Sequence, residues 1–169
     1  LFPREIGDLR VADVVDTKGA VRRKVLIRAE VAYNGYERTV FTSNQKVRAP
    51  LEEYLDWRVV NGVGLGTPGR FRGLDPHSHL YINGRTGEGF RMTQYKQDGK
   101  DRQSAMVISA LFREVLQQAG VEGCAKSGRR TFAVLLGRQG KDPALVRQMM
   151  GLQSISAAKA IMKGDPVRT

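Results

Sequence analysis

The sequence contains few of the residues that build metal and redox sites. Among 169 residues there is one cysteine, Cys124, and there are two histidines, His77 and His79. A single cysteine excludes an internal disulfide and a cysteine-based zinc site, and it fits a reducing compartment such as the cytoplasm. The two histidines share one loop and have no third ligand nearby, so we predict no metal site and no cofactor.

Long apolar segments and a secretory leader are also missing. The longest apolar runs have a few residues, such as Phe132-Ala133-Val134-Leu135-Leu136, whereas roughly 20 are needed to cross a bilayer. No charged segment followed by an apolar one opens the chain. We therefore expect no membrane partner. We interpret residues 1–169 as a single domain cut from a longer protein, because the length suits one domain and the first residue is not methionine.

Recognisable enzyme motifs are scarce. The glycine-rich segment 61–73 lacks the Gly-Lys-Ser/Thr ending of a phosphate-binding loop and the βαβ context of a dinucleotide fold. The chain has no nucleophile elbow and no ordering of Ser, His and Asp that suits a hydrolase. We therefore predict no small-molecule substrate.

Acidic residues are few relative to basic ones. Against 28 Lys and Arg there are 17 Asp and Glu, which gives a net charge of +11. The net charge is +4 over residues 1–50, +1 over 51–120 and +6 over 121–169. A domain this basic favours a polyanionic partner, with nucleic acid ahead of an acidic membrane surface. A solvated basic face without a partner is the alternative.

The hydrophobic pattern predicts a mixed α+β fold that is mainly helical, with a small antiparallel sheet near the start. Two β-type runs, residues 24–33 and 36–41, flank Asn34-Gly35, which predicts a hairpin with a tight turn. A short strand is expected over residues 80–82, and a polar loop from there to residue 103.

Six helices are expected. They cover residues 3–9, a segment opened by Pro50, residues 104–119, residues 131–136, residues 143–150 and a last helix capped by Ser154 or Ser156. In the third, Val107, Leu111, Val115 and Ala119 form the expected core face. Asp142-Pro143 and Gly151 are start and stop signals for the fifth.

A basic cluster precedes the 131–136 helix. Lys126, Arg129 and Arg130 lie just before Thr131, where guanidinium groups and free helix amides together suit a phosphate. A solvated basic cap is the alternative for this cluster.

The order of these segments resembles the catalytic domain of the tyrosine recombinases, the phage-integrase family. The likeness covers nearly the whole chain and is carried by Glu5-Ile6-x-x-Leu9-Arg10, Glu37-Arg38-Thr39-Val40, the segment from Phe112 to Val121, Lys126-Ser127-Gly128-Arg129-Arg130-Thr131-Phe132-Ala133, and Val146-Arg147-Gln148-Met149-Met150-Gly151-Leu152-Gln153-Ser154-Ile155. The resemblance implies a fold that grips duplex DNA. It also implies an upstream DNA-clamping domain that this chain lacks.

The resemblance also locates the catalytic positions, and most are substituted. The first arginine position falls on Phe2, the hairpin lysine on Tyr33, the first histidine on Lys126, the second histidine on Leu152 and the tyrosine nucleophile on Ile161. Only Arg129 is retained. Because isoleucine cannot form a phosphotyrosyl bond and the missing cations would stabilise the transition state, the resemblance implies an inactive site.

The leading hypothesis is therefore a non-catalytic DNA-binding protein, acting as an accessory or regulatory factor on a mobile element, plasmid or phage. Its expected DNA contacts are Arg22, Arg23, Lys24, Arg38, Lys126, Arg129 and Arg130. One alternative is an active recombinase that uses Tyr33, Tyr36, Tyr95 or a tyrosine from a partner subunit. The other is a protein-docking module that self-associates through its last helix, by Ala157, Ala158, Ala160 and Ile161.

Overall fold

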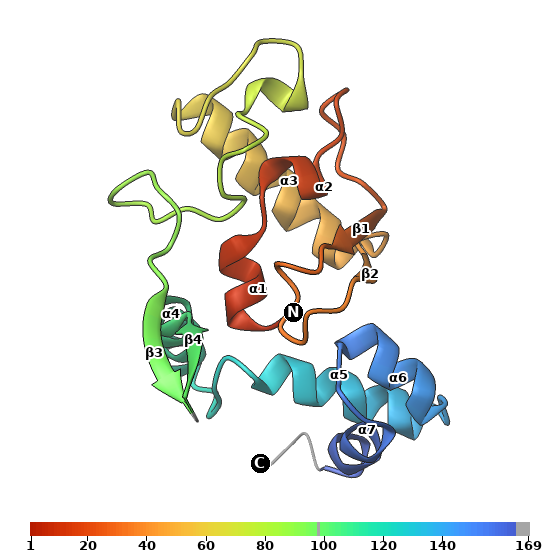
Figure 1. The fold of residues 1–169 in the computed structure, drawn as a ribbon. Coiled ribbons are helices and arrows are strands. Elements are labelled where there is room, and N and C mark those ends of the chain that lie inside the picture. Colours follow the sequence, from red (N-terminus) through yellow and green to blue (C-terminus); the bar gives the residue numbers. More distant parts are fainter. Residues whose placement is uncertain (98, 165–169) are drawn as a thin grey trace.

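The computed structural model describes residues 1–97 and 99–164, and it shows a mainly helical α+β protein (Figure 1). The elements are α1 (Pro3–Asp8), α2 (Val11–Val14), β1 (Lys24–Ile27), β2 (Arg38–Phe41), α3 (Gln45–Val60), the 3-10 turn η1 (Phe71–Gly73), β3 (Thr93–Gln97), β4 (Lys100–Ser104), α4 (Met106–Gln118), α5 (Ser127–Arg138), α6 (Pro143–Met150) and α7 (Ile155–Met162). The fold class is the one predicted. Among the described residues, no helix has the length and apolar character needed to cross a bilayer.

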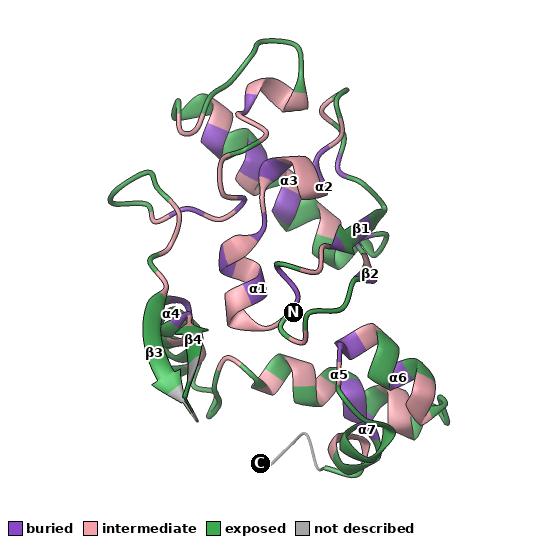
Figure 2. Cartoon of the chain, in the orientation of Figure 1, coloured by how far each residue is buried: buried purple, intermediate pink, exposed green. Residues whose placement is uncertain are grey.

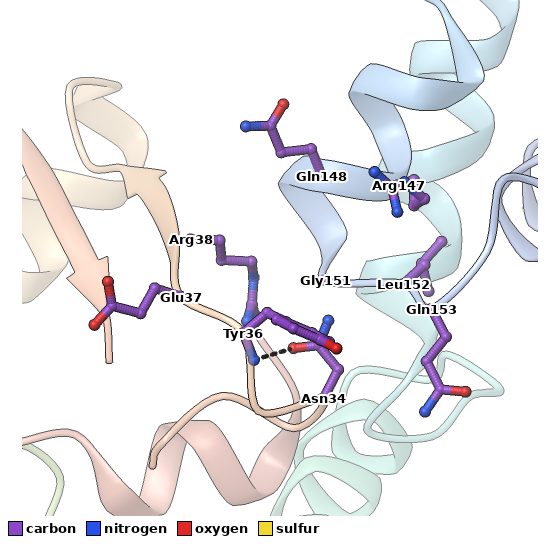
Figure 3. A pocket seen from close by; sticks show the side chains of 9 residues that line it. All are labelled: Asn34, Tyr36, Glu37, Arg38, Arg147, Gln148, Gly151, Leu152 and Gln153. Atoms are coloured by element: carbon purple, nitrogen blue, oxygen red, sulfur yellow. Dashed lines mark hydrogen bonds between the residues drawn. The ribbon is translucent and has the colours of Figure 1, made fainter. Parts of the chain in front are cut away.

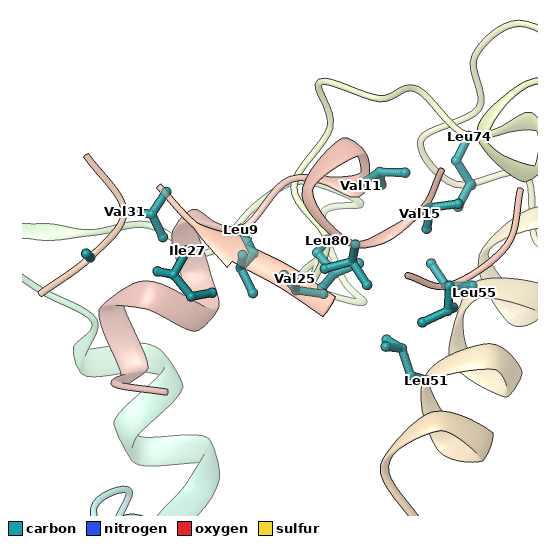
Figure 4. Close-up of a cluster of buried hydrophobic side chains, with 13 residues drawn as sticks. Leu9, Val11, Val15, Val25, Ile27, Val31, Leu51, Leu55, Leu74 and Leu80 are labelled. Atoms are coloured by element: carbon teal, nitrogen blue, oxygen red, sulfur yellow. The ribbon is translucent and has the colours of Figure 1, made fainter. Parts of the chain in front are cut away.

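One hydrophobic core organises the N-terminal half (Figure 4). Its buried side chains come from α2, β1, α3 and the loops around them, and include Val11, Val25, Leu55 and Leu80. The alternation in β1 explains part of this core, because Val25 and Ile27 face inward while their neighbours are exposed. This core fixes α1 and the β1–β2 hairpin relative to α3.

The hairpin exists, but its turn differs from the prediction. β1 pairs antiparallel with β2, with Ile27 opposite Arg38, so residues 28–37 form a wide loop instead of a tight Asn34-Gly35 turn. The chain bends first at residues 28–32, where the amide of Ala32 donates to the carbonyl of Arg28 at 2.8 Å. The amide of Tyr33 then donates to Glu5 Oε1 at 2.9 Å. This contact from α1 holds the loop open, which a local turn signal cannot predict.

Helix α3 begins earlier than predicted, and a buried arginine anchors the loop that follows it. Asn44 caps α3 by accepting from the Lys46 amide at 2.9 Å, so Pro50 lies inside the helix instead of opening it. Arg58 is fully buried, and its Nη1 donates to the carbonyls of His79 and Leu80 at 2.8 and 3.1 Å. The strand expected at residues 80–82 is reduced to an isolated bridge between Ile82 and Gly89.

The segment expected to be a polar loop contains a second hairpin. β3 and β4 pair antiparallel, with Thr93 opposite Ser104, and residues 93–96 of β3 are exposed (Figure 2). Ser104 ends β4, so the first turn of α4 has Ala105 at its N-cap. The predicted core face of α4 is wrong: Val115 is 62% exposed, and only Ile108 of this helix is buried. Its apolar stripe has little of this chain packed against it.

Helices α5, α6 and α7 form a second, smaller core. Ala133, Val146, Met150 and Ala158 are its buried residues. The predicted caps are present: Asp142 accepts from the Ala144 amide at 3.1 Å, and Ser154 accepts from the Ala157 amide at 3.0 Å. Gly151 ends α6 with a φ of 65°, which glycine adopts without strain. α5 begins at Ser127, earlier than predicted, so Arg129 and Arg130 lie in its first turn and Lys126 is its N-cap.

Candidate functional site

The two basic ends of the chain meet at a stack of three side chains, Phe2, Tyr33 and Arg129. The rings of Phe2 and Tyr33 stack with centroids 4.2 Å apart and planes inclined by 26°. The guanidinium carbon of Arg129 lies 3.6 Å from the centroid of the Phe2 ring. We call this arrangement the Phe2 stack. It joins the start of α1, the hairpin loop and the first turn of α5, so it bridges the two cores.

Arg129 has a second contact that limits what it can do. Its Nη2 donates to the carbonyl of Met150 at 2.8 Å, at the end of α6. A cation at this position is favourable, because the last carbonyls of a helix carry partial negative charge. Burial, with a smaller effect from the nearby Arg38 charge and opposed by Glu5, lowers the pKa of Arg129 to about 10. Arg129 remains charged at neutral pH but is committed to protein contacts.

Glu5 is a fully buried carboxylate that contacts the backbone of two residues of the Phe2 stack. It accepts three hydrogen bonds, from Arg38 Nη2 at 2.6 Å, the Phe2 amide at 2.7 Å and the Tyr33 amide at 2.9 Å. Burial raises the pKa of Glu5, but the hydrogen bonds from Arg38 and the two amides outweigh it, so its pKa lies below the usual value. Glu5 therefore fixes the positions of Phe2 and Tyr33 through their backbone.

The structure places Arg38 differently from the other predicted DNA contacts. Its side chain is 3% exposed and forms an ion pair with Glu5. The hairpin carries Arg38 inward from β2, and the α6–α7 turn covers it, since a Cβ on Gly151 would lie 3.0 Å from Arg38 Nη1. Arg38 is therefore not an exposed surface cation like most of the other predicted DNA contacts.

The remaining predicted contacts are exposed. Arg22, Arg23 and Lys24 lie at the start of β1, and Lys126 and Arg130 lie at the start of α5. Lys126 occupies the N-cap position of α5. Among the described residues, none of these five side chains has a hydrogen bond or ion pair to another side chain. Their role in DNA binding stays a prediction.

Two of the positions that the resemblance assigns to catalysis are part of the second core. Leu152 and Ile161 are partly buried and pack against the core residues of α5, α6 and α7. Ala158 of α7 is fully buried in the same core. The α7 face expected to dock a second subunit is therefore partly used inside this chain, although Ala157 and Ala160 remain exposed.

Sequence reasoning missed Glu5 as a member of this site. The resemblance quoted Glu5 as part of a motif, but an acidic residue in a first helical turn is usually solvated. It also treated Phe2 and Tyr33 as two separate substitutions, each of which replaces a catalytic cation. The signal that was available is that both substitutions are aromatic, and aromatic side chains within contact distance stack.

Comparison with solved structures gives the fold. The chain is similar to the crystal structure of XerA recombinase, with a TM-score of 0.65 and 19% sequence identity over 96% of this chain and 47% of that one. The chain thus spans about half the length of that structure. No protein-family model and no curated protein matches the chain by sequence. The fold is therefore similar to that of a tyrosine-recombinase catalytic domain.

Proposed function

We propose that this chain is a DNA-binding protein built on a tyrosine-recombinase-like fold that no longer cleaves DNA. We further propose that it acts as an accessory or regulatory factor on a mobile element, plasmid or phage, and associates with nucleoid or plasmid DNA. The observation that carries the first proposal is the Phe2 stack. A phenyl ring occupies the place expected for a catalytic cation, and it holds the one retained arginine.

Strand transfer through a phosphotyrosine makes chemical demands that these residues do not meet. The reaction needs a nucleophile, cations around the pentacoordinate phosphate and a proton donor for the leaving oxygen. At the nucleophile position Ile161 packs against the second core, and Arg129 donates to the Met150 carbonyl. Ile161 and Arg129 thus make packing and structural contacts at positions where the reaction needs a nucleophile and a cation that is free to bind the phosphate.

The charge distribution supports duplex DNA as the partner. The net charge is +11. Among the described residues, no acidic side chain forms an ion pair with the exposed cations Arg22, Arg23, Lys24, Lys126 and Arg130. Contacts to backbone phosphates make affinity fall steeply with salt and carry little sequence information.

The test is to measure binding of short duplexes by fluorescence anisotropy over a series of NaCl concentrations. We expect the dissociation constant to rise steeply and log-linearly with salt, and to differ little between sequences of equal length. Absence of binding at low salt, where the electrostatic contribution is largest, would contradict the proposal.

An active recombinase with a displaced nucleophile is the second candidate, and one observation favours it. The Tyr33 side chain is 52% exposed, and it stacks on the ring that carries Arg129. A nicked suicide substrate, which traps the covalent intermediate, separates the two candidates. An adduct that forms with the natural chain and disappears in Tyr33→Phe would establish cleavage, whereas we expect no adduct.

A further inference from the structure

A pocket of about 630 Å³ lies beside the Phe2 stack, between the hairpin loop and the α6–α7 turn (Figure 3). The hairpin contributes residues between 34 and 38, and the turn contributes residues between 147 and 153. None of the three residues of the Phe2 stack lines it. The pocket is thus a neighbour of the substituted catalytic positions, with Leu152 as the residue common to both.

Arg38 brings unsatisfied donors to this pocket. Its side chain is 3% exposed, and Nη2 is occupied by Glu5. Nε and Nη1 are buried and have no hydrogen-bond partner among the described residues. Buried guanidinium nitrogens normally have an acceptor, because a buried donor without one keeps the full cost of its desolvation. Arg38 therefore has two donors, Nε and Nη1, that can bind an acceptor from outside the described part of the chain.

The opposite wall of the pocket adds a second guanidinium. Arg147, in the last turn of α6, is exposed, and its side chain forms no hydrogen bond or ion pair within the described part of the chain. Gln148 and Gln153 add neutral amide groups that can donate hydrogen bonds. The lining has one carboxylate, Glu37, which Figure 3 shows directed away from the α6–α7 turn.

Gly151 is what allows the two walls to approach. It turns the chain with a φ of 65°, and the guanidinium of Arg38 lies against it, so that a Cβ there would be 3.0 Å from Nη1 and 3.2 Å from Nε. A side chain at this position would separate the hairpin from the turn. Because Gly151 has no side chain, Arg38 lies close to the end of α6, where Arg147 is in the last helical turn.

We propose that this pocket binds a phosphate group, held by Arg147 and by the free donors of Arg38. Planar guanidinium groups match the oxygens of phosphate in geometry and charge, and amide donors complete such a shell. Arg38 and Arg147 are not among the positions that the resemblance assigns to catalysis. The phosphate is either that of a DNA backbone, in which case the inference rests on the proposed function, or a free phosphate ion.

The test uses the Nε–Hε signal of Arg38 in a two-dimensional ¹H–¹⁵N NMR spectrum. Inorganic phosphate is titrated at constant ionic strength, with NaCl as the balancing salt. We expect the Arg38 signal and the amides of Gly151 and Leu152 to shift along one saturable curve. Shifts that do not saturate, or that equal those caused by chloride alone, would overturn the inference.

Variants decide whether the response comes from this pocket. Arg147→Gln keeps the size and polarity of an exposed side chain, and we expect it to weaken phosphate binding about five- to tenfold, as for loss of one charge-assisted contact. Gln153→Glu adds a negative charge to the lining and should also weaken it. Arg113→Gln, at an exposed position on α4, is the matched control and should leave the curve unchanged. Equal affinity in Arg147→Gln and the natural chain would overturn the inference.

The source of the phosphate is distinguished with two further probes. Dimethyl phosphate represents a phosphodiester, and a short duplex represents DNA itself. If both reproduce the Arg38 shift, the pocket takes a backbone phosphate; if only inorganic phosphate does, it takes the free ion. Should the duplex fail to bind anywhere on the protein, the proposed function fails, but the phosphate titration still decides whether this site exists.

Discussion

The guanidinium of Arg129 lies on the ring of Phe2, 3.6 Å from its centroid, while its Nη2 donates to the carbonyl of Met150 at 2.8 Å. One side chain thus joins the first residues of the chain to the end of α6. In a phosphate-binding site, an arginine donates hydrogen bonds to the ligand. Here the same group links the two hydrophobic cores, so we expect its main effect to be on stability.

Phe2→Ala should destabilise the fold measurably. The substitution removes the ring stacked on Tyr33 and the surface under Arg129, and such contacts contribute about 0.5–1.5 and 0.5–2 kcal/mol respectively. We expect the free energy of unfolding, measured by urea denaturation, to fall by about 1–3 kcal/mol. Tyr36→Ala is the control, because Tyr36 is 75% exposed and should cost little. Equal losses in the two variants would show that the stack is not stabilising.

Removing the charge of Glu5 should cost more than removing the charge of an exposed residue. Glu5→Gln leaves Arg38 as a buried cation without a counter-charge, and breaking one side of such a pair costs about 3–5 kcal/mol. Asp8→Asn breaks a partly exposed pair with Arg4 and should cost about 1 kcal/mol or less. The double variant Glu5→Leu with Arg38→Met should recover part of the loss in urea denaturation. A double variant less stable than Glu5→Gln would contradict this account.

Stability should also fall in acid through Glu5. Its pKa is lower in the folded chain than the usual value of 4.5, so the unfolded chain takes up the proton first as the pH falls. The stabilisation is complete above the unfolded pKa and is lost as the pH falls through 4.5 and then through the folded pKa. Unfolding free energies measured between pH 7 and pH 3 should decline less in Glu5→Gln than in the natural chain. Parallel curves would rule out Glu5 as a source of the decline.

The parts of the fold that the sequence predicts well are those fixed by local contacts. Asp142-Pro143 and Gly151 bound α6 as expected, and Ser154 caps α7, because a cap acts on amides two or three residues away. The burial of an amphipathic helix depends on what is packed against it. The apolar stripe of α4 has the period of a core helix, yet Leu111 and Val115 are exposed, since neither hydrophobic core includes a residue of this helix.

The candidate site could be located from the sequence but not described. The resemblance brought Phe2, Tyr33 and Arg129 to one place, and the contacts of the Phe2 stack agree with that position. The burial of Glu5 and Arg38 could not be predicted, because a charged residue gives no local sign of whether it is solvated or paired in a core. That pairing decides which predicted cations are available at the surface.

The last prediction separates DNA contacts from structural arginines. Arg130 is exposed in the first turn of α5, next to Arg129, which is held by Phe2 and Met150. Arg130→Gln should weaken binding to all duplexes similarly and lower the slope of log affinity against log salt by about one unit, as for loss of one phosphate contact. Its urea denaturation midpoint should stay within error of the natural chain. Arg129→Gln should do the reverse, with a lower midpoint and, under conditions where it is folded, a salt slope close to that of the natural chain. If Arg129→Gln instead reduced the slope by one unit without loss of stability, Arg129 would be a phosphate contact, and its place on Phe2 would not persist when DNA is bound.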